Sequence, residues 1–431
     1  MKGYEEKTER SKGLYARAGK VLPAGVSYAI RDITPHPFYI AEAKEAKLTD
    51  VDGNVYTDYW MGHGAMILGH APDKVVEAVA EQIHKGTHFG FVHELEVELA
   101  ERITDMIPSA EMLRYTSSGT EANMYASRLA RAYTGRDGMV KIEGGWHGGY
   151  DSLHTAVHYF GAPESAGLNP KTYEDTGAVP FNDLEAAREA LKGEDVACLI
   201  VEPMMGAAGF LTPEPGYLEG LREICDSTGT LLIFDEVITG FRLSPGGAQP
   251  LYGVDADVTI IGKIMGGGFP IGAFCGRRDI FERLDHRKYP DAQERSFHGG
   301  TFTGNPISMV AGVTTLDILK EGKVHPKIDD LGGKVSRGLE DIIERSGVDA
   351  VMTGVGSAFA VHFQKEKPRN AREMAKNDTS IAKAYWAHML ARGIIYISPA
   401  LPHSFIGEPH TMEDVEEFLA ASEEFFKAQK A

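Results

Sequence analysis

LLIFDEV, residues 231–237, sets four apolar residues directly before an acidic pair, and TIIGKIMGGG, residues 259–268, runs from apolar residues into one lysine and three glycines. Short apolar runs of this kind recur from about residue 113 to residue 274 and alternate with stretches of helical periodicity. Parallel strands need crossover connections and are buried on both faces, so the alternation predicts a mainly parallel sheet covered by helices on both sides. Asp235 and Lys263 then belong at the carboxyl edge of that sheet, where catalytic groups are expected.

The segments on either side of this region have different patterns. Residues 37–59 form short strand-like runs broken by Asp52-Gly53, which is a hairpin-type signal. After residue 305 the chain reads as a long helix, a polar region of helix and strand, and an acidic amphipathic helix. Because 431 residues exceed what one core usually supports, we predict an N-terminal segment, 1–65, that joins a small domain, a large domain, 66–315, and a C-terminal small domain, 316–431.

Composition limits the partners. Sixty-two acidic residues against 44 basic ones give a formal net charge of -18, which disfavours nucleic acid and anionic membrane surfaces. An anionic small molecule can still bind, because helix N-termini and local charges act at short range. The cysteines are scattered without zinc-type spacing, so we expect neither disulfides nor a metal site. The polar N-terminus, and the absence of a run near the roughly 18 apolar residues of a membrane span, favour a cytoplasmic protein.

Two early segments could carry chemistry, and each has a plainer alternative. Ser118-Gly119-Thr120 stands between a strand and a helix, where free N–H groups and the helix dipole suit an anion, although the same residues could be an ordinary helix cap. Asp235 ends a buried strand and needs a partner. A protonated pyridine nitrogen, a metal ion or a structural ion pair would each serve.

Two later segments complete the pattern. Lys263 interrupts an apolar strand end, and a lysine that deprotonates easily suits Schiff-base chemistry, whereas a lysine that reaches solvent beside a flexible turn is the plainer interpretation. HGGTFTGNP, residues 298–306, again sets hydroxyls among glycines before a helix. Each signal is weak alone. Their order is specific: an anion-type turn, a strand-end carboxylate, a lysine 28 positions later, and a second hydroxyl turn.

Longer motifs in this order give the chain a family resemblance that covers nearly all of it. They are GVSYAIR, DVDGNVYTDY, SSGTEAN, KIEGGWHGGYD, VEPMMG, LLIFDEVITGFR, GKIMGGGFPIGAF and GGTFTGNP. The chain resembles the class III aminotransferases, which are fold-type I enzymes dependent on pyridoxal 5′-phosphate (PLP), and within them most closely the glutamate-1-semialdehyde 2,1-aminomutase branch. The resemblance implies a large domain with a mainly parallel seven-stranded sheet flanked by helices, a smaller α+β domain from both termini, and a homodimer.

The resemblance also implies roles for individual residues. Lys263 would carry PLP as a Schiff base and move protons at the substrate, and Asp235 would pair with the pyridine nitrogen. The other expected contacts are Ser118, Gly119 and Thr120 at the phosphate, Thr301 at the same phosphate from the partner subunit, Val237 and Trp146 on the two ring faces, and Glu202 near O3′. For Glu202 a purely structural role is an equal alternative.

The substrate side departs from the aminomutase pattern. Arg31 of GVSYAIR matches the family's arginine for the substrate carboxylate, which suits a bidentate donor, against the alternative of a surface arginine. Tyr28 stands where the aminomutase motif has a small serine. The gating stretch is replaced by AVHYFGAPESAGLNPKTYED, residues 156–175, and Pro402, with His403 after it, stands where the aminomutase has a glutamate.

These departures favour one reaction. An aminomutase must retain its intermediate through both halves of the reaction, so an altered gate and pocket point toward product release. We therefore predict a ping-pong transaminase that moves an amino group from an amino acid or amine to a keto acid, aldehyde or ketone. The alternatives are glutamate-1-semialdehyde aminomutase activity, an amino-acid epimerase, and a non-catalytic PLP-binding protein, which an intact Lys263 and Asp235 disfavour.

Overall fold

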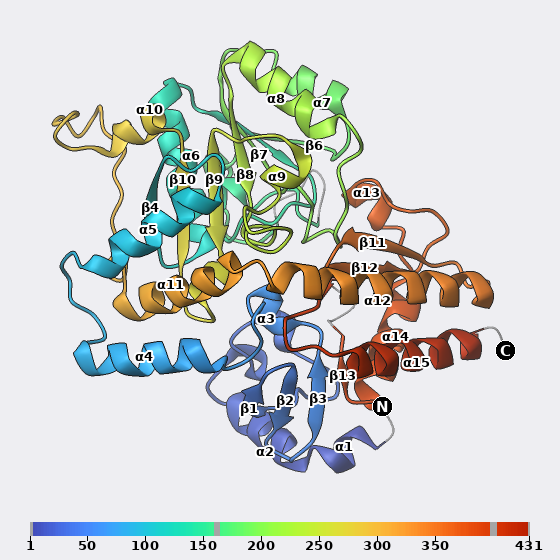
Figure 1. Cartoon of the computed structure of the whole chain (residues 1–431). Helices are drawn as coiled ribbons and strands as arrows, with labels where there is room; N and C mark the ends of the chain where they lie inside the picture. The colour runs from blue at the N-terminus through green and yellow to red at the C-terminus, as the bar shows by residue number, and fades with distance from the viewer. Residues whose placement is uncertain (1–2, 159–163, 397–402, 430–431) are drawn as a thin grey trace.

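A seven-stranded sheet forms the centre of the upper half of the protein in Figure 1. The computed structural model describes residues 3–158, 164–396 and 403–429. Among the strands of this sheet, ordered β4-β10-β9-β8-β7-β5-β6, β10 alone runs antiparallel to its neighbours, which confirms the mainly parallel sheet. The strands are β4 (Met112–Thr116), β5 (Gly138–Ile142), β6 (Thr176–Val179), β7 (Val196–Val201), β8 (Leu231–Asp235), β9 (Val258–Gly262) and β10 (Gly272–Gly276).

The central strands β7, β8 and β9 are buried along their whole length because helices cover both faces of the sheet. Successive side chains of a strand point to opposite faces. Ile200 of β7 thus packs with helix α6 (Gly119–Thr134), whereas Leu199 packs with α8 (Tyr217–Thr228) on the other side. The unbroken apolar runs of the sequence therefore belong to strands with no solvent-facing side.

Three further helices lie beside the sheet: α4 (Asp73–Lys85) and α5 (Glu94–Met106) both pack against α11 (Pro306–Lys320). The remaining elements of this half are the short helices α7 (Leu184–Ala190), α9 (Gln249–Tyr252) and α10 (Arg278–Phe281) and the 3-10 turns η3 (Asp151–Leu153), η4 (Pro170–Thr172), η5 (Lys263–Gly266) and η6 (Glu282–Leu284).

The smaller half combines the two ends of the chain, as the resemblance implies. One sheet joins β1 (Ile40–Lys44), β2 (Lys47–Asp50) and β3 (Val55–Asp58) to β13 (Ile394–Ile395), which pairs with β3 in parallel. A second sheet holds β11 (Val351–Val355), β12 (Ala358–His362) and β14 (Ser404–Phe405). The other elements are α1 (Tyr4–Lys7), α2 (Glu9–Ala18), η1 (Pro23–Gly25), η2 (Ala29–Arg31), α3 (Met61–Gly64), α12 (Val324–Ser346), α13 (Ala371–Met374), α14 (Thr379–Ala391) and α15 (Met412–Gln429).

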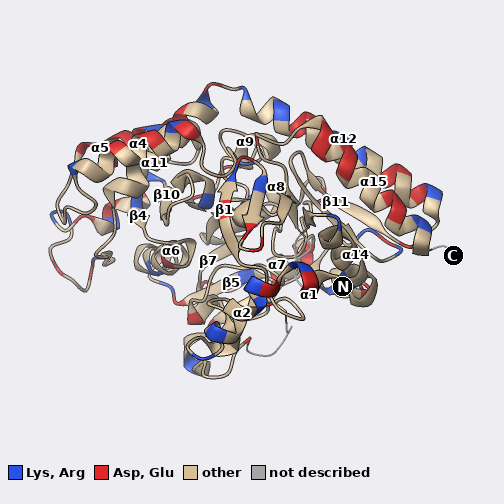
Figure 2. Cartoon of the chain, turned by 90° about the horizontal axis from the view of Figure 1, so that it is seen from below, with Lys and Arg blue, Asp and Glu red and all other residues tan. Residues whose placement is uncertain are grey.

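Helices α11 and α12 run across the middle of Figure 1, below the seven-stranded sheet and above strands β1, β2 and β3. Helix α11 continues through residue 315, so the division of the chain at that residue stays a prediction. In Figure 2 acidic and basic residues are mixed along the outer helices α12 and α15. Within the described residues, no helix is long and apolar enough to cross a membrane, and no group of three or more His, Cys, Asp or Glu could hold a metal ion.

Candidate active site

A pocket of about 460 Å³ lies at the carboxyl ends of the parallel strands. Lys263 follows β9, Asp235 ends β8 and Glu202 follows β7, so neighbouring strands deliver all three side chains to one edge of the sheet. Eight residues singled out in the sequence line this pocket: Ser118, Gly119, Thr120, Trp146, Glu202, Asp235, Val237 and Lys263. Tyr28, Arg31 and Thr301 do not line it.

The backbone of Lys263 is strained. Its φ of 47° lies in the left-handed region, which costs a non-glycine residue on the order of 1–3 kcal/mol. Burial lowers the pKa of its ammonium group to about 8, against the opposing charges of Glu202 and Asp235. No hydrogen bond joins the Lys263 amine to another described residue. The side chain therefore has an appreciable neutral fraction near neutral pH and a free nitrogen, as an amine nucleophile needs.

Asp235 is held by three donors. Its Oδ2 accepts from Asn123 Nδ2 at 2.9 Å and from His147 Nδ1 at 2.8 Å, and its Oδ1 accepts from the Val237 N–H at 3.1 Å. Burial lowers the pKa of His147 despite the Asp235 carboxylate, so the imidazole is a neutral donor through Nδ1. The other residue of the acidic pair, Glu236, is fully buried and is hydrogen-bonded away from the pocket.

Sequence reasoning did not assign roles to His147 and Asn123. Both lie inside motifs that carried the resemblance, GGWHGG and SSGTEAN. Their place in these motifs was the one sequence feature that could have indicated a role. Their spacing to Asp235, 88 and 112 positions, has no local periodicity. His147 Nε2 and Asn123 Oδ1 are buried without a partner, which leaves polar atoms next to the pocket unsatisfied.

Glu202 and Lys141 organise the loop that carries Trp146. Glu202 accepts from the N–H groups of Trp146 and Gly206, each at 3.0 Å, and burial, with the charge of Asp235, raises the pKa of Glu202 to about 7. Lys141 of β5 is fully buried, and burial lowers its pKa to about 8. Its Nζ donates to three loop carbonyls, those of Gly145 at 2.9 Å, Leu153 at 3.1 Å and Thr155 at 2.7 Å.

The start of α6 has the features of an anion site. Ser118 caps the helix through Oγ, which accepts from the Glu121 N–H at 3.3 Å, so the plain cap is also present. The Gly119 and Thr120 N–H groups point out of the first turn with no partner among the described residues. A Cβ on Gly119 would lie 2.9 Å from Val237 Cγ2, so glycine alone leaves that close approach unstrained.

These features fit PLP. The helix start can hold a phosphate, Asp235 stands ready for a pyridinium nitrogen, and Val237 and Trp146 border the space between them. Lys263 supplies an amine in the same pocket. One cavity therefore offers a site for the phosphate, a carboxylate for the pyridinium nitrogen and a lysine amine.

Three expected residues lie outside that pocket. The Tyr28 ring stacks on His63 with centroids 6.2 Å apart, and Arg31 donates to Ser27 Oγ at 3.1 Å and lines an apolar cavity of about 490 Å³. Thr301 is exposed. Pro402 and residues 159–163 of the gating stretch lie outside the described residues.

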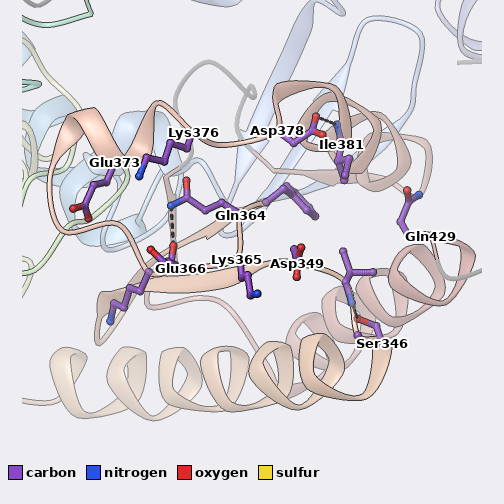
Figure 3. Close-up of a pocket in the computed structure, with 14 residues that line it drawn as sticks. Ser346, Asp349, Gln364, Lys365, Glu366, Glu373, Lys376, Asp378, Ile381 and Gln429 are labelled. Carbon is purple, nitrogen blue, oxygen red and sulfur yellow. Dashed lines mark hydrogen bonds between the residues drawn. The ribbon is translucent and has the colours of Figure 1, made fainter.

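Another hollow, of about 620 Å³, lies in the smaller half (Figure 3). Acidic and basic side chains line it together, and Gln364 donates to the Glu366 carbonyl at 2.8 Å. None of the residues of the Lys263 pocket borders it. It is separate from the candidate active site.

Comparisons with known proteins agree with the geometry. The aminotransferase class-III family matches residues 28–401. The chain is 44% identical, over 98% of its length and 100% of the relative, to glutamate-1-semialdehyde 2,1-aminomutase of Methanothermobacter thermautotrophicus. It superposes on an omega-transaminase from Sphaerobacter thermophilus with a TM-score of 0.94 at 32% identity, covering 100% of both chains. A glutamate-1-semialdehyde aminomutase from Pseudomonas aeruginosa gives a TM-score of 0.90 at 26% identity, covering 98% of this chain and 95% of the other. The protein therefore belongs to the class III aminotransferases, the PLP-dependent enzymes of fold type I.

Proposed function

We propose that the protein is a ping-pong transaminase in which Lys263 anchors PLP and moves the proton at the reacting carbon. The proposal rests on the Lys263 amine: burial lowers its pKa to about 8, and it has no hydrogen-bond partner among the described residues in the pocket that Asp235 borders. When bound, PLP supplies an electron sink for the carbanion that forms when the proton leaves. A lysine whose pKa lies close to neutral pH suits that proton transfer.

The remaining pocket residues orient the cofactor in this proposal. Asp235, fixed by His147 and Asn123, keeps the pyridine nitrogen protonated through its negative charge. Ser118, Gly119 and Thr120 hold the phosphate, Val237 and Trp146 cover the ring faces, and Glu202 lies near O3′ while it fixes the Trp146 backbone.

Transamination is preferred over the intramolecular reaction because of the Tyr28–His63 contact. A phenol ring stacked on an imidazole, with Lys263 close enough to lower the pKa of that imidazole, occupies the substrate side where the aminomutase motif has a serine. A pocket reshaped at this point is less suited to keeping an intermediate bound through two half-reactions. The second candidate, glutamate-1-semialdehyde 2,1-aminomutase activity, is favoured by the name of the 44% identical relative.

Product analysis separates the two reactions. The PLP-loaded enzyme is first mixed with a panel of amino acids and amines, without acceptor, and loss of the absorbance of the lysine-linked cofactor is followed. Conversion by several donors, completed only when a keto acid or aldehyde is added, supports the transaminase. Conversion of glutamate-1-semialdehyde to 5-aminolevulinate without any acceptor, with no response to the panel, would establish the aminomutase instead.

The proposal includes a homodimer in which Thr301 reaches the phosphate of the partner subunit. Segments 86–93 and 297–305 lie against each other, since His93 Nε2 bonds the Gly304 carbonyl at 2.7 Å and Asn305 Nδ2 donates to the Thr87 carbonyl at 2.9 Å. Both segments expose apolar side chains: Phe91 is 84% exposed, Val92 89%, Phe297 65% and Phe302 60%. An exposed apolar surface of this kind, beside an exposed Thr301, supports contact with a second copy.

Mixed dimers test this arrangement. Lys263→Ala and Thr301→Ala homodimers should each be inactive or weakly active alone. When the two variants are mixed and their subunits exchange, each mixed dimer should contain one site with Lys263 from one subunit and Thr301 from the other. Activity should then return. A monomer by light scattering, or no recovery on mixing, would refute the shared site. A cytoplasmic location is part of the same proposal.

A further inference from the structure

Two histidines lie near Lys263 and have no part in the proposed cofactor contacts. His63 belongs to α3, and His403 directly precedes β14, so they come from opposite ends of the chain. Their ring centroids are 6.3 Å apart. Each is close enough to Lys263 for its positive charge to add to the effect of burial and lower the pKa of the imidazole.

Each ring has one nitrogen that is buried and lacks a partner, the sealed nitrogen, and one that is not, the open nitrogen. His63 Nε2 and His403 Nδ1 are buried without a hydrogen-bond partner among the described residues. The opposite nitrogens, His63 Nδ1 and His403 Nε2, are neither sealed in this way nor hydrogen-bonded to a described residue. An orphaned N–H is rarer in proteins than an orphaned acceptor. The proton of each ring therefore belongs on the open nitrogen, which makes each imidazole a neutral hydrogen-bond donor at that atom.

Packing keeps the rings in these orientations. His63 lies 4.2 Å from the Trp60 ring, and its other neighbour is Tyr28. His403 is packed at 5.6 Å against both Phe210 and Phe405 in edge contacts. A ring flip would exchange the open and sealed nitrogens without giving either a partner among the described residues, so the aromatic contacts favour the present ring orientations.

We propose that His63 and His403 determine specificity by donating hydrogen bonds, from Nδ1 and Nε2 respectively, to an acceptor oxygen of the substrate away from its amine. The substrate class is then an amino compound, or the matching keto compound, that carries an ether, carbonyl or carboxylate oxygen on that side. This inference rests on the proposed transaminase function. Both donors are neutral, so they complement Arg31, whose permanent charge suits a carboxylate.

The tautomers test the inference without any substrate. In ¹⁵N-histidine-labelled holoenzyme, with His63→Phe and His403→Phe samples for assignment, His63 should carry its proton on Nδ1 and His403 on Nε2 between pH 6 and 8. The opposite tautomer at either ring, or an imidazolium in this range, would overturn the proposal.

Kinetics test the contact itself. Norvaline and O-methylserine have the same length and differ by one CH₂ replaced with an ether oxygen, which accepts but cannot donate. The ratio of kcat/KM for the ether to that for the hydrocarbon should fall about tenfold in His63→Phe or His403→Phe, the loss expected for one hydrogen bond. The amide nitrogen of Asn mimics Nδ1 and that of Gln mimics Nε2. His63→Asn and His403→Gln should therefore restore the ratio, whereas His63→Gln and His403→Asn should not.

The controls keep this test apart from that of the proposed function. Lys376→Ala, in the separate hollow of Figure 3, should leave the ratio unchanged. If the wild-type enzyme converts neither amino acid, the keto acids 2-oxopentanoate and 3-methoxypyruvate serve as the pair in the reverse half-reaction. An equal fall for both members, or no rescue by the matched amides, contradicts the histidine contact even when transamination itself is intact. Failure of every donor and acceptor contradicts the transaminase, and the tautomers still decide the geometry.

Discussion

Lys141 and Lys263 both interrupt apolar strands or strand ends, and burial lowers the pKa of each to about 8. Their surroundings differ. The Lys141 ammonium is fully buried and donates to three carbonyls, whereas the Lys263 amine borders a pocket and has no hydrogen-bond partner among the described residues. Similar pKa values therefore accompany opposite roles: hydrogen bonds stabilise the charged form of Lys141, and their absence leaves Lys263 free to lose its proton.

The same contrast holds for two arginines. Arg242, which follows the LLIFDEV strand, is fully buried and donates to the backbone carbonyls of Ile406 at 2.8 Å and Gly64 at 2.9 Å. Arg31 is exposed and bonds only the hydroxyl of Ser27 within the described residues. A buried cation that donates to carbonyls from distant segments joins parts of the fold, and an exposed cation with donors to spare can bind a substrate.

Replacing Lys263 should have the largest effect. Lys263→Ala should fold as a dimer and bind PLP without a covalent link, while turnover falls by roughly 10³-fold or more because nucleophile and proton carrier are lost together. Borohydride reduction followed by peptide mapping checks the assignment. Attachment of PLP to another lysine of the wild-type chain, Lys141 included, would contradict the assignment of Lys263 as the reactive lysine.

Asp235→Asn should come next. The amide keeps the size of the carboxylate but removes the charge that favours a protonated pyridine, so turnover should fall by about a hundredfold or more. The absorbance of bound cofactor as a function of pH reports the ring nitrogen. Glu236→Gln is the matched control, because Glu236 is hydrogen-bonded away from the pocket and should affect stability more than turnover. Near-wild-type rates for Asp235→Asn would mean that this carboxylate is structural.

Arg31→Ala should change selectivity. Amino-acid donors should lose about tenfold or more in kcat/KM, because a charge-assisted pair with their carboxylate is lost, while 1-phenylethylamine, which has no carboxylate, should lose little. The ratio of the two rates is the measurement. If both fell equally, Arg31 would not be the carboxylate site, and His403 would be tested before the buried Arg242.

Lys141→Met should act on the fold. Methionine has a similar length but leaves three buried carbonyls without a donor, so the free energy of unfolding should fall by about 1 to 3 kcal/mol. The loop that carries Trp146 should loosen, and PLP affinity should decline while the covalent link to Lys263 still forms. Unchanged stability in urea would show that the three hydrogen bonds contribute nothing net.

The smallest effect is a shift in pH dependence. Capture of PLP by the apoenzyme requires the neutral Lys263 amine, so its rate should rise as pH increases toward about 8 and level off above it. The charge of Glu202 raises the pKa of Lys263, so Glu202→Gln should move this midpoint to lower pH. Stopped-flow absorbance measures the rates, and Glu423→Gln, on the surface of α15, is the control. A midpoint that moves upward would contradict the assigned charge effect.

The sequence by itself determined the sheet and the order of the chemical residues around it. Unbroken apolar runs such as LLIF are typical of central parallel strands, and parallel strands bring their carboxyl ends to one edge, so the sequence predicted that Asp235 and Lys263 lie near each other. Motif order then indicated the family, which the class-III match confirmed.

Tertiary structure alone decided the partners and the substrate side. His147 meets Asp235, and Lys141 meets its three carbonyls, through contacts that no local period relates. Tyr28, His63 and His403 come together because β13 pairs with β3 and joins the two ends of the chain. The lowered pKa values of Lys141 and Lys263 depend on burial, which is a property of the packed molecule, so the sequence could name the reactive lysine but could not show which of the two is hydrogen-bonded and which is free.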